Sequence, residues 1–568
     1  MRGRRNTTLS MSSTDSTHST PRRSSNDAYV EKKFHDLPDS PALPVPATTK
    51  ENSSRPRTGK AMAVKLVLVA CGVLMLWRYL CGSWMHPATT PEQIEAQRQS
   101  QADLEWIAAN ALPEEPTALV VADPTGTSKW TISIPHHHSF PLSGHYYKDI
   151  CSQGDTMRRG LADDAGFGGG HHWWHRNGYF AKDASYLDIE EAENLGALPK
   201  TNVEVSNVCE TSMTFVLDDE EASFGKSLLL LWMSYGLANQ QGRAFFIEDS
   251  TWAWGKYSAY FRPPPAPKCA RPPPHRMVPC PHTAKHVVVS SATAAWTFGS
   301  SFEKEFKSMH RHGVAAQHRI FQLARTGYEA LFELTGEDAL YLSSRMAQLQ
   351  DDAAARHGSI VGMQIRRGDM HPFEYEYSRD YLPLERYAEG ARSLLQSSHG
   401  KEDSEDVVNN TSSPLLLASD DPGTISSTEL QQAVAPFSVQ RAHLRIQLAT
   451  KETLDSTSPR KSQRAPGSAY VKHVDENTGW EGGFFSGLFF SLGGGKDGSR
   501  DQAIQMRQLV GRAYLLDIAI LGASDGVVCA ISSATCRTVA VMMGWDAVKD
   551  GRWLNIDDGR SWSWNGRR

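Results

Sequence analysis

The sequence predicts an α/β protein with parallel sheets that follows a disordered N-terminal tail and one transmembrane helix. Beyond Cys209, short apolar strands alternate with apolar or amphipathic helices, which is the pattern of βαβ units. Residues 1–60 are rich in Ser, Thr, Pro and Arg and poor in aromatic residues, a composition typical of disorder. Residues 66–77 form an uncharged apolar run. A chain of 568 residues is long enough for two or three domains.

The charge pattern around the apolar run predicts the topology. Residues 1–60 hold eleven Lys and Arg against six Asp and Glu, so a formal charge of -5 for the whole chain leaves about -10 on the rest. The run extends to a transmembrane signal anchor at 61–85 if Lys65 and Arg78 snorkel towards the headgroups. Basic sequence before the anchor and acidic sequence after it predict a cytosolic tail and a luminal body. A buried core helix is the alternative, but the preceding polar stretch offers nothing to pack against it. The acidic body argues against nucleic acid as a partner.

Residues 86–125 are predicted to form a stem with one short helix near 92–111. Two histidine clusters follow, at 136–138 and within 171–175. No carboxylate or cysteine lies at ligand spacing from them, so we expect packed or solvated histidines and no metal site.

Within the body, ten segments carry a clear secondary-structure pattern. Helices are predicted at 223–241, in two or three pieces within 301–349, at 383–395, 424–434, 501–523 and 533–543, and strands at 243–249, 359–365, 414–418 and 526–531. In such folds ligands bind beyond the carboxyl ends of the strands. Two insertions, 397–413 and 450–500, interrupt the pattern. The first holds overlapping glycosylation sequons at Asn409 and Asn410. The second holds an aromatic island at 480–490, either a variable surface loop or a lip that faces acceptor or membrane.

Cysteine usage fits an oxidising compartment. Cys71 and Cys81 belong to the predicted anchor, and six cysteines follow it: Cys151, Cys209, Cys269, Cys280, Cys529 and Cys536. An even number permits three disulfides but leaves their pairing open. The chain has no CxxC pair, which disfavours a zinc ribbon.

The segment 361–377 carries the sharpest chemical pattern. A strand runs directly into Arg366 and Arg367, and guanidinium groups at a strand's carboxyl end are suited to hold a diphosphate. Glu374, eight residues after Arg366, is near enough to act as general base on an incoming hydroxyl. The alternative is an Arg–Asp ion pair that closes a loop.

Two later segments add polar groups at helix and strand ends. Asp420 or Asp421 is expected to cap the helix that follows, with Pro422 near its first position. Ser532 and Ser533 stand where a strand meets a helix start, which is a ready anion site. Asp517, inside an apolar helix, needs partners if buried, and the N1–H and amino group of guanine would supply two donors.

Taken in order, these segments resemble the α1,6-fucosyltransferase family of Golgi core fucosylation and bacterial nodulation enzymes. The family's His-x-Arg-Arg-x-Asp strand end is similar to Gln364-Ile365-Arg366-Arg367-Gly368-Asp369, and its Leu-Ala-Thr-Asp-Asp-Pro to Leu417-Ala418-Ser419-Asp420-Asp421-Pro422. Its C-terminal signature is matched by Leu516-Asp517-Ile518, Cys529, Ser532-Ser533 and Cys536-Arg537. A weaker similarity runs from Gly225 through Arg243 and Glu248 to Cys269. The resemblance covers about 209–395, 414–436 and 501–560.

The resemblance implies a GT-B-like architecture of two Rossmann-like domains, an N-terminal luminal subdomain at 126–355 and a nucleotide-sugar-binding subdomain at 356–568. It also implies inverting, metal-independent transfer of fucose from GDP-fucose to a glycan or glycoprotein acceptor, without a cofactor, in a single-pass type II protein of the Golgi membrane. The chain has no Asp-x-Asp triplet, which agrees with metal independence.

Carried over by position, the family roles fall on named residues. Arg366 would bind the β-phosphate, with Arg367, Ser532 and Ser533 also at the phosphates, Gly225 in a phosphate-cradling turn, Asp517 and Gln364 at guanine, and Glu374 as the base. Asp369, Asp420 and Asp421 would hold these loops, and Cys529–Cys536 and Cys209–Cys269 would be disulfides. Gln364 stands where the family has histidine, and Met370 where it has the lysine that assists the base. Two alternatives remain: a catalytically idle membrane protein that binds glycan or nucleotide, and a transferase that uses another GDP-sugar.

Overall fold

In a computed structural model of the chain, the described residues are 113–123, 125–164, 178–200, 206–218, 223–367, 381–398, 415–448, 499–557 and 559–566. They belong to a compact unit that spans Pro91–Arg568; a first unit spans Met1–Thr90. The predicted tail 1–60, anchor 61–85 and stem helix 92–111 lie outside the described residues, as does the aromatic island at 480–490. Within the described ranges, no helix has the length and apolar character needed to cross a membrane.

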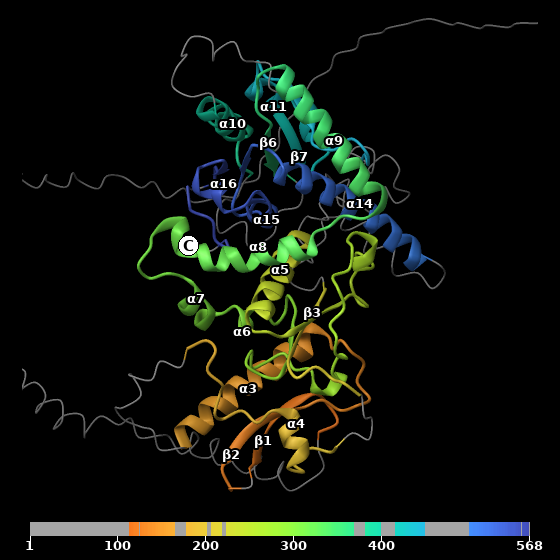
Figure 1. The fold of residues 1–568 in the computed structure, drawn as a ribbon, viewed down its shortest axis with the longest axis vertical. Coiled ribbons are helices and arrows are strands. Elements are labelled where there is room, and N and C mark those ends of the chain that lie inside the picture. Colours follow the sequence, from red (N-terminus) through yellow and green to blue (C-terminus); the bar gives the residue numbers. More distant parts are fainter. Residues whose placement is uncertain are drawn as a thin grey trace, which may run out of the picture. The chain divides into compact units, whose positions relative to one another are not determined.

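A β-hairpin opens the described chain. β1 (Thr117–Ala122) pairs antiparallel with β2 (Ser128–Ser133), and α3 (Gly144–Asp164) packs against both strands (Figure 1). The apolar side chains of Ala118, Leu119 and Trp130 are buried in this packing. The boundary predicted at 125 between stem and body therefore falls in the turn of a hairpin whose two strands share one core.

The first parallel sheet has the strand order β4–β3–β5, formed by β3 (Ser212–Val216), β4 (Ala244–Glu248) and β5 (His286–Val289). Only β4 is among the strands predicted above. β3 is fully buried, but it contains the polar residues Ser212 and Thr214, so its sequence does not read as a buried strand. The partner that satisfies such a polar group comes from a distant segment. Ser212 Oγ, for example, lies 3.0 Å from Nδ1 of the buried His286 on β5.

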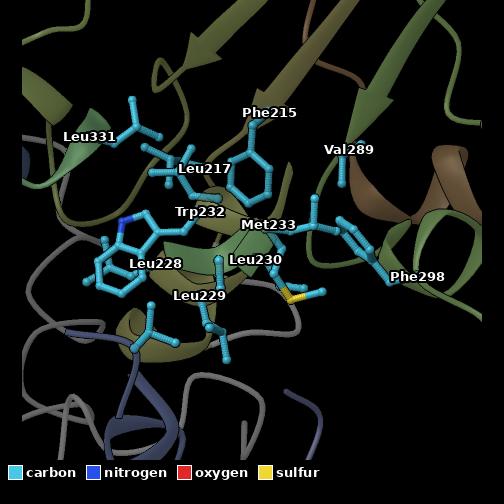
Figure 2. Packing of buried hydrophobic residues seen from close by; sticks show 14 of the residues in the cluster. Phe215, Leu217, Leu228, Leu229, Leu230, Trp232, Met233, Val289, Phe298 and Leu331 are labelled. Atoms are coloured by element: carbon cyan, nitrogen blue, oxygen red, sulfur yellow. The ribbon is translucent and has the colours of Figure 1, made fainter. Parts of the chain in front are cut away.

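The core beside this sheet is built on α5 (Phe224–Gln240), the apolar helix predicted at 223–241. Figure 2 shows Leu228, Leu229, Leu230 and Trp232 of this helix beneath Phe215 of β3 and Val289 of β5. α8 (His318–Leu331) crosses α5 closely, since a Cβ at Gly236 would overlap the Leu323 carbonyl and one at Gly327 would overlap the Trp232 carbonyl. Burial of this apolar surface is the main force that holds the two helices together.

The second parallel sheet has five strands in the order β10–β9–β6–β7–β8. They are β6 (Val361–Ile365), β7 (Leu415–Ser419), β8 (Val439–Arg441), β9 (Gly526–Cys529) and β10 (Trp553–Asn555). From β6 the chain proceeds outward through β7 and β8 on one side and through β9 and β10 on the other. The strand order thus reverses between β6 and β9, which is the switch point where ligands bind in open α/β sheets.

The helices of this half are α9 (Gly336–Ala355), α10 (Leu384–Ser398), α11 (Thr428–Val434), α14 (Ser499–Gly522), α15 (Ala534–Met543) and α16 (Trp545–Lys549). Shorter elements are α4 (Ile189–Asn194), η1 (Tyr257–Ala259), η2 (Pro274–Arg276), α6 (Ala294–Thr297), α7 (Ser300–Phe306), η3 (Gly313–Gln317) and η6 (Thr424–Ser426). The predicted α/β class with parallel sheets is confirmed, while β8 and β10, three residues each, are too short for a periodic signal.

Three disulfides connect the six cysteines that follow the predicted anchor: Cys151–Cys280, Cys209–Cys269 and Cys529–Cys536. The last two are the pairs that the family resemblance implied. The first, which the sequence left open, joins α3 to the segment that precedes β5.

Candidate functional site

The carboxyl end of β6 carries the arginine pair. Arg366 Nη1 donates to Oδ2 of Asp420 at 2.6 Å, and the backbone N–H of Arg367 donates to Oδ1 of the same carboxylate at 2.5 Å. Asp420 follows β7, the strand next to β6, and its side chain is fully buried. The ion-pair alternative weighed from the sequence is therefore present in the structure. It fixes the Arg366 guanidinium at the strand end and joins the two loops.

Arg367 is held by different groups. Its Nη2 donates to both carboxylate oxygens of Glu429, at 2.9 and 3.0 Å, and its guanidinium lies 5.7 Å from the ring centre of Tyr381. Glu429 also accepts from the N–H of Leu384 at the start of α10. The sequence analysis missed Glu429, although a carboxylate in the first turn of the helix after β7 was a signal for it.

Two buried polar atoms at this strand end have no hydrogen-bond partner among the described residues. They are Oε1 of Gln364, a residue only 4% exposed, and Nε of Arg367. Nearly all buried polar atoms in proteins are hydrogen-bonded, so two unpartnered atoms within four residues of each other indicate that a partner from outside these ranges fits at this strand end. The two atoms offer one acceptor and one donor.

The predicted residues Ser532 and Ser533 follow β9, on the other side of the switch point from Arg366. Ser533 is the N-cap of α15, and its side chain makes no capping hydrogen bond. The Ser532 N–H donates to Oδ2 of Asp557, beyond β10, at 3.4 Å. The Cys529–Cys536 disulfide ties the last residue of β9 to the first turn of α15. The N-terminus of a ten-residue helix thus faces the carboxyl edge of the sheet, an arrangement suited to an anion.

Gly225 contacts α15 from the first half of the body. It lies in the first turn of α5 rather than in an open turn, because Ser223 caps the helix by accepting from the N–H of Lys226 at 3.4 Å. The Gly225 carbonyl accepts from Oγ1 of Thr538 at 3.1 Å. The structure therefore brings Gly225 against the helix that Ser533 starts.

Asp517 lies in α14, with its side chain 21% exposed. Its Oδ1 accepts from the N–H of His443, two residues beyond β8, at 3.3 Å, and lies 3.8 Å from Nε2 of the same histidine. Burial raises the pKa of Asp517 to about 6, and the nearby His443 and Arg441 limit the rise. One turn earlier, the Tyr514 hydroxyl lies 3.2 Å from Oγ1 of Thr535 in α15, so α14 connects Asp517 to the Ser533 side of the site.

The predicted helix cap by Asp420 or Asp421 is wrong. Asp420 accepts hydrogen bonds from Arg366 and Arg367 instead. Asp421 Oδ1 accepts from the N–H of Gly423 at 2.8 Å and so stabilises the turn in which Asp421 itself lies. The segment predicted as one helix at 424–434 is instead η6 followed by α11, and Ser427 caps α11. Asp420 lies close enough to the end of β6 to pair with a guanidinium group, which is a stronger donor than the N–H groups of a helix start.

Several predicted site residues lie outside the described residues: Glu374, Asp369, Asn409 and Asn410. The described residues contain no group of three or more His, Cys, Asp or Glu side chains arranged to hold a metal ion. In the first histidine cluster, the His136 ring packs edge-on against His275 at 4.3 Å.

A search by sequence finds no matching family model and no matching curated protein. Among solved structures, the chain is similar to the crystal structure of NodZ α1,6-fucosyltransferase soaked with GDP-fucose, at 12% identity and a TM-score of 0.27, over 58% of this chain and 92% of that one. It is also similar to selenomethionyl fucosyltransferase NodZ from Bradyrhizobium, at 12% identity and a TM-score of 0.28, over 58% and 91%. A NodZ structure co-crystallised with GDP matches at 10% identity and a TM-score of 0.24, over 58% and 91%. Superpositions this loose establish neither a shared fold nor an activity.

Proposed function

We propose that this chain is a glycosyltransferase that transfers fucose from GDP-fucose to a glycan or glycoprotein by inverting, metal-independent displacement. In this proposal the two parallel sheets form a GT-B-like pair, and the body lies in the Golgi lumen behind a type II anchor. One observation carries the proposal. Arg366, which follows β6, and Ser533, the N-cap of the helix that follows β9, flank the switch point of a five-stranded parallel sheet, and Asp517 is joined to the same edge through α14.

At the phosphate end, the leaving group is a nucleoside diphosphate that gains negative charge as the sugar departs. Arg366 and Arg367 provide fixed guanidinium donors, and the first turn of α15 provides backbone N–H groups with the positive end of the helix dipole. Groups that are held in place before the reaction stabilise this charge without reorganisation. The unpartnered Nε of Arg367 supports a phosphate oxygen as the missing partner.

At the base end, Asp517 is a suitable acceptor for guanine. Its pKa of about 6 leaves the carboxylate ionised at neutral pH, so it accepts from N1–H and the amino group together. Adenine presents an acceptor at N1 and would place it against the carboxylate, so two acceptors would face each other where guanine supplies a donor. In the proposed reaction Glu374 removes the proton from the acceptor hydroxyl as the new bond forms.

A second candidate is a catalytically idle protein of the same architecture that binds nucleotide or glycan. The observation that favours it is that Arg366 and Arg367 are paired with Asp420 and Glu429. Two carboxylates then offset the two positive charges that a diphosphate requires. In this candidate the arginines close the loops beyond β6 and β7 and release no leaving group.

A thermal-shift panel followed by a turnover assay separates these candidates. The full-length chain is incubated with GDP, UDP, GDP-fucose and GDP-mannose, and GDP release is then measured with a mixture of glycoprotein acceptors. Stabilisation by GDP and GDP-fucose, with GDP release from GDP-fucose alone, supports the fucosyltransferase. GDP release from GDP-mannose alone would show that the donor is another GDP-sugar than GDP-fucose. Thermal stabilisation of the chain without any GDP release favours the idle protein. No stabilisation by any guanine nucleotide overturns the nucleotide site itself.

A further inference from the structure

A cavity of about 570 Å³ lies between η1, the start of α9 and α14. Its lining residues are Ala259, Thr335, Gly336, Glu337, Asp338, Gln505, Gln508, Leu509 and Arg512. None of them belongs to the arginine, serine or aspartate groups at the carboxyl edge of the second sheet. The volume falls within the roughly 300–1,000 Å³ typical of small-molecule sites.

The charged lining residues of the cavity are Glu337, Asp338 and Arg512, and Arg445, which does not line it, pairs with both carboxylates. The largely buried Asp338 accepts from Arg512 at both oxygens, Oδ2 from Nε at 2.5 Å and Oδ1 from Nη2 at 2.9 Å. Nε of Arg445, beyond β8, lies 3.1 Å from Oδ1 of Asp338, and the same arginine pairs with Glu337. These contacts fix α9 against α14, and the formal charges of the four groups cancel. A site with no net charge favours neither a phosphate nor a cation.

Polar groups with unused hydrogen-bonding capacity line the cavity beside these charged groups. The side chains of Gln505, which is exposed, and Gln508, which is half-buried, both line the cavity, and no residue that the structure describes holds either amide through a hydrogen bond. The Gln508 amide lies directly against Gly255, whose positive φ of +96° and missing side chain leave it room. An amide offers two donors and an acceptor, so the pair can satisfy several hydroxyl groups.

Apolar surface completes the lining. Leu509 is 46% exposed on the same helix, one residue after Gln508, and Ala259 borders the cavity from η1. A ligand that fits must therefore be uncharged, rich in hydroxyl groups and partly apolar on one face.

From this combination we propose that the cavity binds a neutral saccharide. The amides of Gln505 and Gln508 hydrogen-bond its hydroxyl groups, the Asp338–Arg512 pair forms the polar wall, and Leu509 contacts the C–H face of the sugar ring. The proposal stands independently of the transfer reaction. If the chain is a transferase, this site holds a part of the acceptor glycan away from the hydroxyl that reacts.

The test is a glycan microarray of neutral and sialylated or sulfated glycans, probed with the full-length chain. The neutral glycans that bind are then titrated by saturation-transfer NMR. We expect binding confined to neutral glycans. The double variant Gln505→Ala/Gln508→Ala should weaken it by about tenfold or more, since each lost hydrogen bond to a ligand costs roughly fivefold in Kd. Gln350→Ala, an exposed amide elsewhere on α9, is the matched control and should bind as the wild type does.

An unchanged thermal transition shows that the double variant is folded. Its response to GDP, read in parallel, reports on the nucleotide site separately, so loss of GDP binding with retained glycan binding would affect only the proposed function. Array signals from anionic glycans alone, an empty array, or equal binding by the double variant each overturn the saccharide site.

Discussion

The two parallel sheets use arginine at opposite ends of their strands. In the first sheet, Nη1 of Arg243 donates to the carbonyls of Ser212, Ala284 and Lys285, at 3.3, 2.7 and 2.9 Å, where β3, β4 and β5 begin. In the second sheet, Arg366 and Arg367 follow the last residue of β6 and are held by the carboxylates of Asp420 and Glu429.

The difference lies in what surrounds each guanidinium. Backbone carbonyls at strand starts cannot move without breaking the sheet, so Arg243 is a fixed structural tie. At strand ends the chain leaves the sheet, and partners are side chains that a ligand can replace. The first sheet also closes its carboxyl edge internally, because the Ser291 N–H donates to Asp218 and Glu248 pairs with Arg271. At the second edge, Gln364 Oε1 and Arg367 Nε have no partner among the described residues.

The largest expected effect comes from Arg366. Arg366→Ala should lower transfer by about 10³-fold, because it removes a donor that stabilises the leaving diphosphate. It should also lower the free energy of unfolding by about 3 kcal/mol, because buried Asp420 loses its charged partner. Arg366→Lys keeps that charge, so its loss of GDP affinity, measured by calorimetry, reports on the guanidinium fork alone.

Arg243→Lys is the matched change in the first sheet. It should lower the thermal transition and leave the Kd for GDP unchanged. We assign GDP binding to Arg366 at the strand ends and a structural role to Arg243 at the strand starts. Wild-type GDP affinity in Arg366→Lys, or weakened GDP affinity in Arg243→Lys, would contradict this assignment.

The disulfides sharpen the same contrast. Cys151–Cys280 closes a loop with a sequence separation of 129, and Cys529–Cys536 one of 7. Loop entropy predicts that Cys151→Ala/Cys280→Ala costs about 5 kcal/mol and Cys529→Ala/Cys536→Ala about 2.5 kcal/mol. Only the second pair of changes should weaken GDP binding, because that disulfide frames the start of α15. Chemical denaturation and GDP titration of both variants test this, and weaker GDP binding in the first variant would contradict it.

Asp517 should make nucleotide binding depend on pH. With a pKa of about 6, the carboxylate is ionised at pH 7 and mostly protonated at pH 5, so wild-type GDP affinity should fall about tenfold between them. Asp517→Asn should bind GDP roughly 30-fold more weakly at pH 7, because it loses a charged acceptor, and should show no such pH dependence.

The same pKa fixes the sign of the stability change. Because the folded-state pKa lies above the ordinary value of 3.8, the ionised carboxylate destabilises the fold above about pH 6, and stability is gained as pH falls towards 4. Asp517→Asn should therefore be more stable than the wild type by about 2–3 kcal/mol at pH 8 and equal to it below pH 4. Urea titrations at both pH values measure this, and a destabilised variant at pH 8 would show that the carboxylate is structural.

The smallest effects are expected at two helix caps. Ser533→Ala should weaken GDP binding by about threefold with little change in stability, because the Ser533 side chain makes no capping hydrogen bond. Ser223→Ala removes a cap that does bond its helix, so it should cost about 1 kcal/mol of stability and leave GDP binding unchanged. If Ser223→Ala weakens GDP binding and Ser533→Ala does not, the anion site lies at the start of α5 rather than α15.

The sequence by itself determined the α/β class and most of the long elements of the body, including α5, β6, α14 and β9. These segments carry apolar runs of their own, so each can be recognised without its neighbours. It also placed Arg366, Ser533 and Asp517 at element ends or inside an apolar helix, which marked them as candidate site residues.

The tertiary structure decided how those residues are partnered. The role of Asp420, the contacts of Glu429 and His443, and the strands β3, β5, β8 and β10 depend on segments far apart in the chain. A hydrogen bond such as Arg366 to Asp420, 54 residues apart, leaves no periodic trace in the sequence. Strand order decided which loops meet at the switch point, because it arises from packing among helices and strands rather than from any single segment.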